Sequence, residues 1–198
     1  VVDVQRHAVQ LRRVRVLRDD DGIQRFETLD YGMQPRRWFP AASVTKLPMA
    51  LLMAEAVQAA GGGADSVLRL DAPPASGEWG DEPLDDSLAR GIDRTFAVSE
   101  NRPYNRWYEM LGGERIHRRL AELGYPHVRL ISRLGSSDIE ANRRTGGGAL
   151  LSADGRELRR FPAATAASRR FPFGRVSFGD GWQNDDGSVI AGPHDFSQ

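Results

Sequence analysis

The sequence contains no cysteine among its 198 residues. Disulfides, thiolate metal sites and cysteine catalysis are therefore excluded. No apolar run reaches the roughly 18 residues of a membrane-spanning helix. The formal net charge is zero, so nothing in the composition points to nucleic acid or an anionic membrane as a partner. The four histidines lack metal-ligand spacing, and neither a metal nor another cofactor is expected.

Lysine is almost absent as well. Of the 27 lysine and arginine residues, only Lys46 is a lysine. Arginine stays protonated in proteins, whereas lysine can act as a base when burial or a neighbouring cation lowers its pKa. A chain that uses arginine everywhere else for positive charge therefore marks Lys46 as a candidate for chemistry. The alternative is a surface lysine that happens to lie near a serine.

Lys46 belongs to the stretch Ser43-Val44-Thr45-Lys46, which reads as a turn running into a helix over 43–60. Three glycines at 61–63 end this helix. The apolar spacing predicts one buried face, formed by Leu47, Ala50, Leu51 and Ala54. Ser43 and Lys46 are almost one helical turn apart, so their side chains should project from the same end of the same face. A base beside a serine hydroxyl can convert it into a nucleophile.

The rest of the chain alternates between strand-like and helical patterns. The patterns predict a hairpin over 7–17 and 23–31, a long irregular loop over 64–84, helices over 85–98, 102–111 and 114–123, a short extended piece over 128–131, a surface loop over 133–148, and two hairpins over 149–159 and 176–190. A helical block flanked by strands predicts an α/β protein. The length fits a single domain.

A second motif, Ser99-Glu100-Asn101, falls at the predicted break between two helices. A hydroxyl beside an ammonium can relay a proton, and an amide can both donate and accept hydrogen bonds. Serine and asparagine are also common helix caps, which is the alternative interpretation.

Ser-x-x-Lys followed by Ser-x-Asn resembles the signature of class A β-lactamases and penicillin-binding proteins, with Glu100 in place of aspartate. The resemblance implies a β-lactamase-like three-layer sandwich, in which an antiparallel sheet accompanies a helical block. It implies that Ser43 is the acylated nucleophile and Lys46 its general base, directly or through a relay. Ser99 would pass a proton to the leaving group, and Asn101 would bind substrate or position Lys46. The backbone N–H of Ser43 would form half of an oxyanion hole.

Two elements of that signature are missing or altered. No lysine follows Lys46, so Arg144-Thr145-Gly146 either replaces the Lys-Thr-Gly element or is a surface loop, with the true element beyond Gln198. We accordingly expect residues 1–198 to form a single domain that is incomplete at its C-terminal end. The carboxylate that activates water for deacylation would be Asp138 or Glu140, unless both are solvated surface charges.

The sequence thus predicts a serine hydrolase that acts on an amide, ester or β-lactam bond of a small-molecule or peptide substrate. The alternatives are a penicillin-binding-protein-like peptidase or transpeptidase, and a non-catalytic binding domain on the same scaffold. Family resemblance predicts a periplasmic or secreted location. The oligomeric state does not follow from the sequence.

Overall fold

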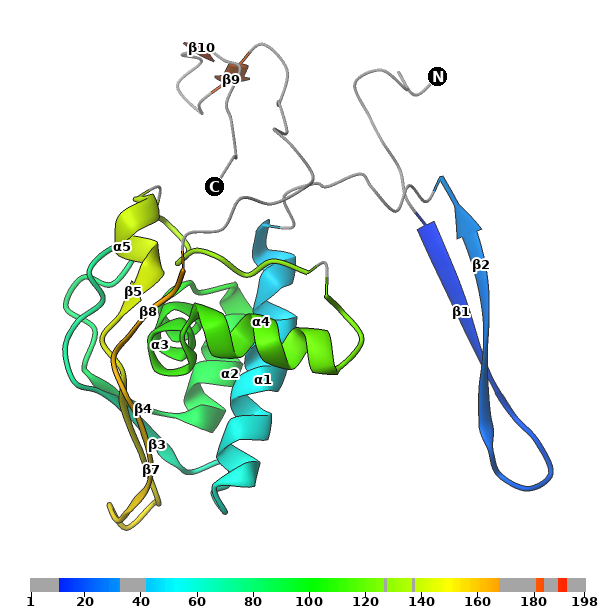
Figure 1. Ribbon diagram of the computed structural model, residues 1–198, viewed down its shortest axis with the longest axis horizontal. Coiled ribbons are helices and arrows are strands. Elements are labelled where there is room, and N and C mark those ends of the chain that lie inside the picture. The colour runs from blue at the N-terminus through cyan, green and yellow to red at the C-terminus, as the bar shows by residue number, and fades with distance from the viewer. Residues whose placement is uncertain are drawn as a thin grey trace. The chain divides into compact units, whose positions relative to one another are not determined.

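The computed structural model describes residues 11–32, 42–126, 128–136, 138–167, 181–183 and 189–191 (Figure 1). The chain divides into two units, one formed by both ends of the chain and one spanning 40–170. The candidate residues Ser43, Lys46, Ser99 and Asn101 all belong to the second unit. Among the described residues, no helix is both long and apolar enough to cross a membrane.

The second unit contains six helical segments and six short strands among its described residues. The helical segments are η1 (Ala42–Thr45, a 3₁₀ turn), α1 (Lys46–Ala59), α2 (Leu88–Val98), α3 (Arg102–Leu111), α4 (Gly113–Glu122) and α5 (Ile139–Arg143). The strands are β3 (Val67–Leu70), β4 (Asp85–Ser87), β5 (Arg144–Thr145), β6 (Gly148–Leu151), β7 (Glu157–Phe161) and β8 (Ala164–Thr165).

Helix α3 is the centre of the core. All residues from Pro103 to Leu111 are buried, and α3 contacts α1, α2, α4 and strands β3, β5 and β6. Its polar members are buried with partners: Asn105 Nδ2 donates to the carbonyls of Glu78 (2.9 Å) and Leu134 (3.0 Å). Because buried polar groups require such partners, these bonds fix two loops onto the helix at defined positions.

The buried face of helix α1 overlaps the predicted one at Ala50, which is buried, and at Ala54, which is partly buried, but not at Leu47 and Leu51. The buried set is Lys46, Met49, Ala50, Leu52, Met53 and Val57, whereas Leu47 is 53 % and Leu51 is 62 % exposed. The helix is apolar on nearly all sides, so spacing alone does not identify the inward face. Lys46 turns inward because its ammonium finds hydrogen-bond acceptors there. The helix itself begins at Lys46 and is preceded by η1, so Ser43 lies in a 3₁₀ turn and not at the helix cap.

Helix α2 also starts later than predicted. Residues 85–87 form β4, and Ser87 caps the helix by accepting a hydrogen bond from the N–H of Arg90 at 3.2 Å. Asp86 is not the cap because its carboxylate binds Arg94. Phe96, near the end of α2, is 52 % exposed and takes no part in the buried face of the helix. Helices α3 and α4 match their predicted ranges to within one residue.

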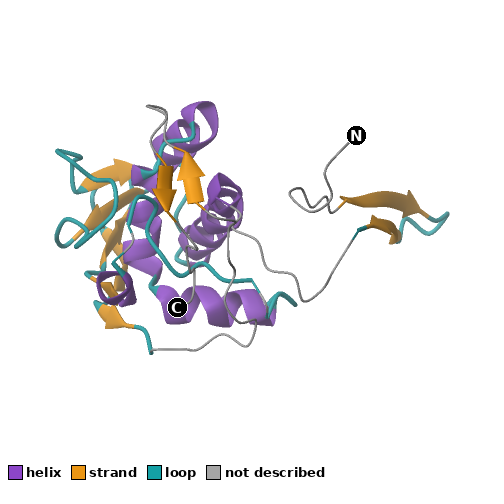
Figure 2. Cartoon of the chain, turned by 90° about the horizontal axis from the view of Figure 1, so that it is seen from above, coloured by secondary structure: helices purple, strands orange, loops and turns teal. Residues whose placement is uncertain are grey.

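A four-stranded antiparallel sheet, in the order β4-β3-β6-β7, lies beside these helices (Figures 1 and 2). β6 and β7 form the hairpin predicted around Asp154-Gly155, and Gly155 has the positive φ (88°) that such a turn favours. β3 lies in the region predicted to be irregular. α5 and β5 lie in the predicted surface loop over 133–148, and residues 128–131 form no strand. The mixed α/β class with antiparallel sheets and a helical block is confirmed.

Two hairpins are found among the described residues of the other unit. β1 (Leu11–Arg18) pairs antiparallel with β2 (Gln24–Tyr31), as predicted. β9 (Gly181–Gln183) pairs with β10 (Val189–Ala191). The predicted first strand of this last hairpin, over 176–179, lies outside the described residues, as do residues 7–10 of the first.

Candidate active site

Ser43 and Lys46 are brought together by the junction between η1 and α1. Thr45 Oγ1 donates to the carbonyl of Ala42 at 2.7 Å, which tightens the turn that carries Ser43. Ala42 has φ of 44°, a conformation that costs a non-glycine residue about 1–2 kcal/mol. The Ser43 side chain is left at the surface, while Lys46 behind it is only 2 % exposed.

The Lys46 ammonium joins the two serines. Its Nζ donates to Ser43 Oγ at 3.2 Å, to Ser99 Oγ at 2.9 Å and to the carbonyl oxygen of Ser99. Ser99 Oγ donates to Ser43 Oγ at 3.2 Å, which closes a triangle of three polar atoms. The structure thus brings together three of the four predicted residues, from η1, α1 and the end of α2.

Burial lowers the pKa of Lys46 below its ordinary value. The negative charges of Glu78 and Glu100 oppose this effect and raise it. Burial is the larger influence because a desolvated ammonium loses hydration that distant carboxylates only partly replace. A lysine with a lowered pKa is the form required of a general base near neutral pH.

Ser99 reaches Lys46 because its backbone is left-handed, with φ of 57° and ψ of 36° at the C-terminal end of α2. Glu100 stabilises this turn: its carboxylate accepts hydrogen bonds from Arg94 Nη2 (2.7 Å) and Nε (2.5 Å), and it also pairs with Arg102. Arg94 in turn binds Glu82 at 2.6 Å. A partly buried network of ion pairs therefore holds the Ser99 turn in a conformation that serine seldom adopts.

Asn101 lies next to this triangle without joining it. It precedes α3, and its carbonyl accepts from the N–H of Asn105 at 3.0 Å, but its side chain makes no capping hydrogen bond. No hydrogen bond between Asn101 and Lys46 occurs in the described structure. The amide is therefore available to a ligand, and its predicted role toward substrate stays a prediction.

An open depression of about 440 Å³ adjoins the triangle, lined by residues 78–80 and 99–102. Glu78 is the member that sequence reasoning missed, because it lies in a loop without a recognisable pattern. Asn105 Nδ2 donates a hydrogen bond to the carbonyl of Glu78. The Glu78 side chain packs over Gly135 so closely that a Cβ added at Gly135 would lie 2.8 Å from Glu78 Cγ. Its carboxylate has no hydrogen-bond or ion-pair partner among the described residues and is exposed.

The remaining candidates are engaged elsewhere. Asp138 caps α5 by accepting from the N–H of Ala141 at 2.9 Å, and Glu140 pairs with Arg143 at 2.7 Å. Arg144 and Thr145 form β5, so the surface loop predicted over 133–148 contains a short strand at this position. In the described structure, none of these side chains contacts Ser43, Lys46 or Ser99.

The buried charged side chains of this region bind the backbone of the surrounding loops instead. Arg133 and Glu109 form an ion pair with 0 % and 2 % side-chain exposure, and Glu109 also accepts from the N–H of Gly146 at 2.6 Å. Arg133 donates to the carbonyls of Ala141 (2.9 Å) and Arg144 (2.5 Å). Within the described ranges, no group of three or more histidine, aspartate or glutamate residues could hold a metal ion.

A mixed α/β domain with a serine and a lysine in contact at the start of a core helix is an arrangement in which a serine hydroxyl can be activated as a nucleophile. The chain belongs to the β-lactamase enzyme family, whose model matches residues 23–165. All four predicted site residues lie inside this match, and the resemblance drawn from the motifs is confirmed at the level of the family. No match was found among the curated proteins.

Proposed function

We propose that the protein is a serine hydrolase that forms an acyl-enzyme on Ser43, with Lys46 as the general base, and that it cleaves an amide, ester or β-lactam bond. The supporting observation is the closed triangle of Ser43 Oγ, Lys46 Nζ and Ser99 Oγ. A buried lysine with a lowered pKa, in contact with an exposed serine, is the pair that nucleophilic catalysis needs.

The contacts among these three side chains support the following proton route. In the reactive state Lys46 is neutral and accepts the proton of Ser43 as Oγ attacks the carbonyl carbon. When the tetrahedral intermediate collapses, the bond to the leaving group breaks and that group takes a proton from Ser99, which Lys46 replenishes. The balance is one proton moved from nucleophile to leaving group, with Lys46 neutral again in the acyl-enzyme.

Hydrolysis of the acyl-enzyme requires an activated water. Asp138 and Glu140 are occupied as a helix cap and an ion pair, so neither supports this step. This favours a long-lived acyl-enzyme, as in penicillin-binding proteins, and makes a peptidase or transpeptidase the second candidate function.

The test is intact-mass spectrometry of the full chain after incubation with a fluorophosphonate and, separately, with a penicillin. Wild type, Ser43→Ala and Lys46→Arg are compared, after their thermal melting confirms folding. Lys46→Arg keeps the positive charge but removes the base, because arginine is not deprotonated in proteins. We expect an adduct on wild type, none on Ser43→Ala, and at least a hundredfold slower labelling of Lys46→Arg.

The time course distinguishes the candidate functions. A penicillin adduct that persists for hours indicates penicillin-binding behaviour, and one that turns over indicates a β-lactamase. Absence of any adduct on folded wild-type protein would overturn the hydrolase proposal and leave a non-catalytic binding domain.

A further inference from the structure

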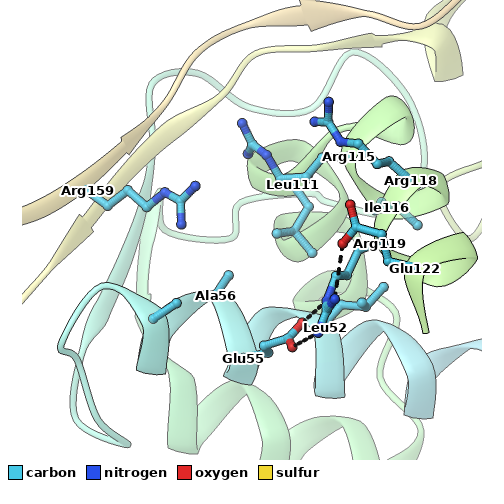
Figure 3. A pocket seen from close by; sticks show the side chains of 11 residues that line it. Leu52, Glu55, Ala56, Leu111, Arg115, Ile116, Arg118, Arg119, Glu122 and Arg159 are labelled. Atoms are coloured by element: carbon cyan, nitrogen blue, oxygen red, sulfur yellow. Dashed lines mark hydrogen bonds and ion pairs between the residues drawn. The ribbon is translucent and has the colours of Figure 1, made fainter.

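A second cavity, of about 320 Å³, lies between α1, the end of α3, α4 and β7 (Figure 3). It shares no residue with the depression beside Ser99. Its floor is apolar: Leu52, Leu111 and Ile116 line it and are themselves buried. Pockets of this size and character accommodate small ligands with an apolar part.

Charge is distributed unevenly around this cavity. Four arginines and two glutamates line it, which leaves a local excess of two positive charges in a chain of zero net charge. Both glutamates serve one arginine: Arg119 binds Glu55 at 2.5 Å and Glu122 at 3.1 Å, as the dashed lines in Figure 3 mark. The Arg119 group therefore carries one net negative charge, and the other three arginines carry three positive charges.

Those three are Arg115, Arg118 and Arg159, and no carboxylate among the described residues pairs with any of them. Arg115 and Arg159 lie over the ring of Phe161, with guanidinium-to-centroid distances of 5.2 and 5.1 Å. Figure 3 shows Arg159 entering from the strand side and Arg115 from α4. Two cations held by one ring repel each other, and the pKa of Arg115 is lowered by burial and then by Arg159 and Arg118.

From this arrangement we infer that the cavity binds a small amphipathic carboxylate, with its head group between Arg115 and Arg159 and its hydrocarbon chain over Leu111 and Ile116. A guanidinium offers two parallel N–H donors that match a carboxylate. A bound anion also removes the repulsion between the arginines. The volume of about 320 Å³ lies in the range of pockets that take small molecules, and octanoate has the required combination of a carboxylate and a short hydrocarbon chain.

The experiment is calorimetric titration of the full chain with octanoate at low salt, with acetate and octylamine as comparison probes. We expect saturable octanoate binding, at least tenfold weaker acetate binding and no octylamine binding. Arg159→Gln and Arg115→Gln should each weaken octanoate binding at least fivefold. Arg156→Gln, an equal charge change at an exposed position outside the cavity, should leave the affinity unchanged.

Each contrary result is decisive. Octanoate that binds no better than acetate would show that the apolar floor plays no part. Equal affinities of Arg159→Gln, Arg156→Gln and wild type would overturn the assignment of the head group, and Arg159 is exposed, so its variant should fold. Ser43→Ala should bind octanoate normally, which keeps this site separate from the proposed acylation.

Discussion

The lowered pKa of Lys46 has a thermodynamic consequence that can be measured without any substrate. The ordinary lysine pKa is 10.5, and burial places the pKa of Lys46 in the folded protein below it. Between these two values the unfolded chain binds a proton that the folded chain does not, so stability rises with pH in this window. The slope is at most about 1.4 kcal/mol per pH unit for one group.

Lys46→Met is the perturbation that isolates this effect. Methionine fills a similar volume without a charge, and the Ser43 and Ser99 hydroxyls are exposed enough to be hydrated in its place. At pH 7 the methionine variant should be at least as stable as wild type, because replacing a buried charge by an apolar side chain is often neutral or stabilising. As pH rises toward 10.5, the free energy of unfolding of wild type should increase relative to that of the variant. The gain totals about 1.4 kcal/mol for each unit by which the folded-state pKa is lowered.

The assay is urea unfolding of both proteins from pH 7 to 11, taking the difference in free energy of unfolding so that other titrations cancel. The rate of fluorophosphonate labelling of wild type over the same range gives a kinetic pKa. If Lys46 is the base, both measurements report the same deprotonation and must agree. A flat stability difference would refute the lowered pKa, and two distinct midpoints would refute Lys46 as the base.

Three further changes test the surroundings of this group. Glu78→Gln removes a charge that raises the lysine's pKa, so both midpoints should move to lower pH; no movement would show that the carboxylate is fully screened. Ser99→Gly relieves a left-handed backbone, so urea unfolding should show about 1 kcal/mol more stability, and labelling should slow roughly tenfold or more. Arg133→Met leaves Glu109 buried without its partner and should cost about 3–5 kcal/mol in the same unfolding assay, whereas Arg133→Met combined with Glu109→Gln should cost less.

The sequence was sufficient for the elements whose signals are local. The hairpin turn at Asp154-Gly155, the range of α3 and the Ser43–Lys46 contact all follow from residues close together in the chain. The Ser99 contact also follows, but only through the family resemblance, because 56 residues separate the two serines. No property of Ser99 alone indicates that its backbone turns left-handed and its hydroxyl reaches Lys46.

The predictions that were wrong or incomplete concern features that tertiary contacts determine. The buried face of α1 was partly misassigned because apolar side chains surround the helix, and its direction is set by the acceptors that Lys46 finds. The start of α2 was misplaced because Asp86 binds Arg94 and leaves Ser87 as the cap. Glu78 was missed because its place beside the site depends on Asn105, which holds its carbonyl from a different element.

The residues with unfavourable backbone conformations also lie at the candidate active site. Ala42 and Ser99 are the two non-glycine residues with positive φ in the described structure; Ala42 directly precedes Ser43, and Ser99 accepts hydrogen bonds from the Lys46 ammonium. A buried lysine beside two strained turns is an unfavourable combination for stability. Such combinations persist at functional sites because the surrounding contacts maintain them. Here those contacts are the Glu100 ion pairs and the packing of α1 on α3, so changes in either should affect labelling of Ser43 before they affect the fold.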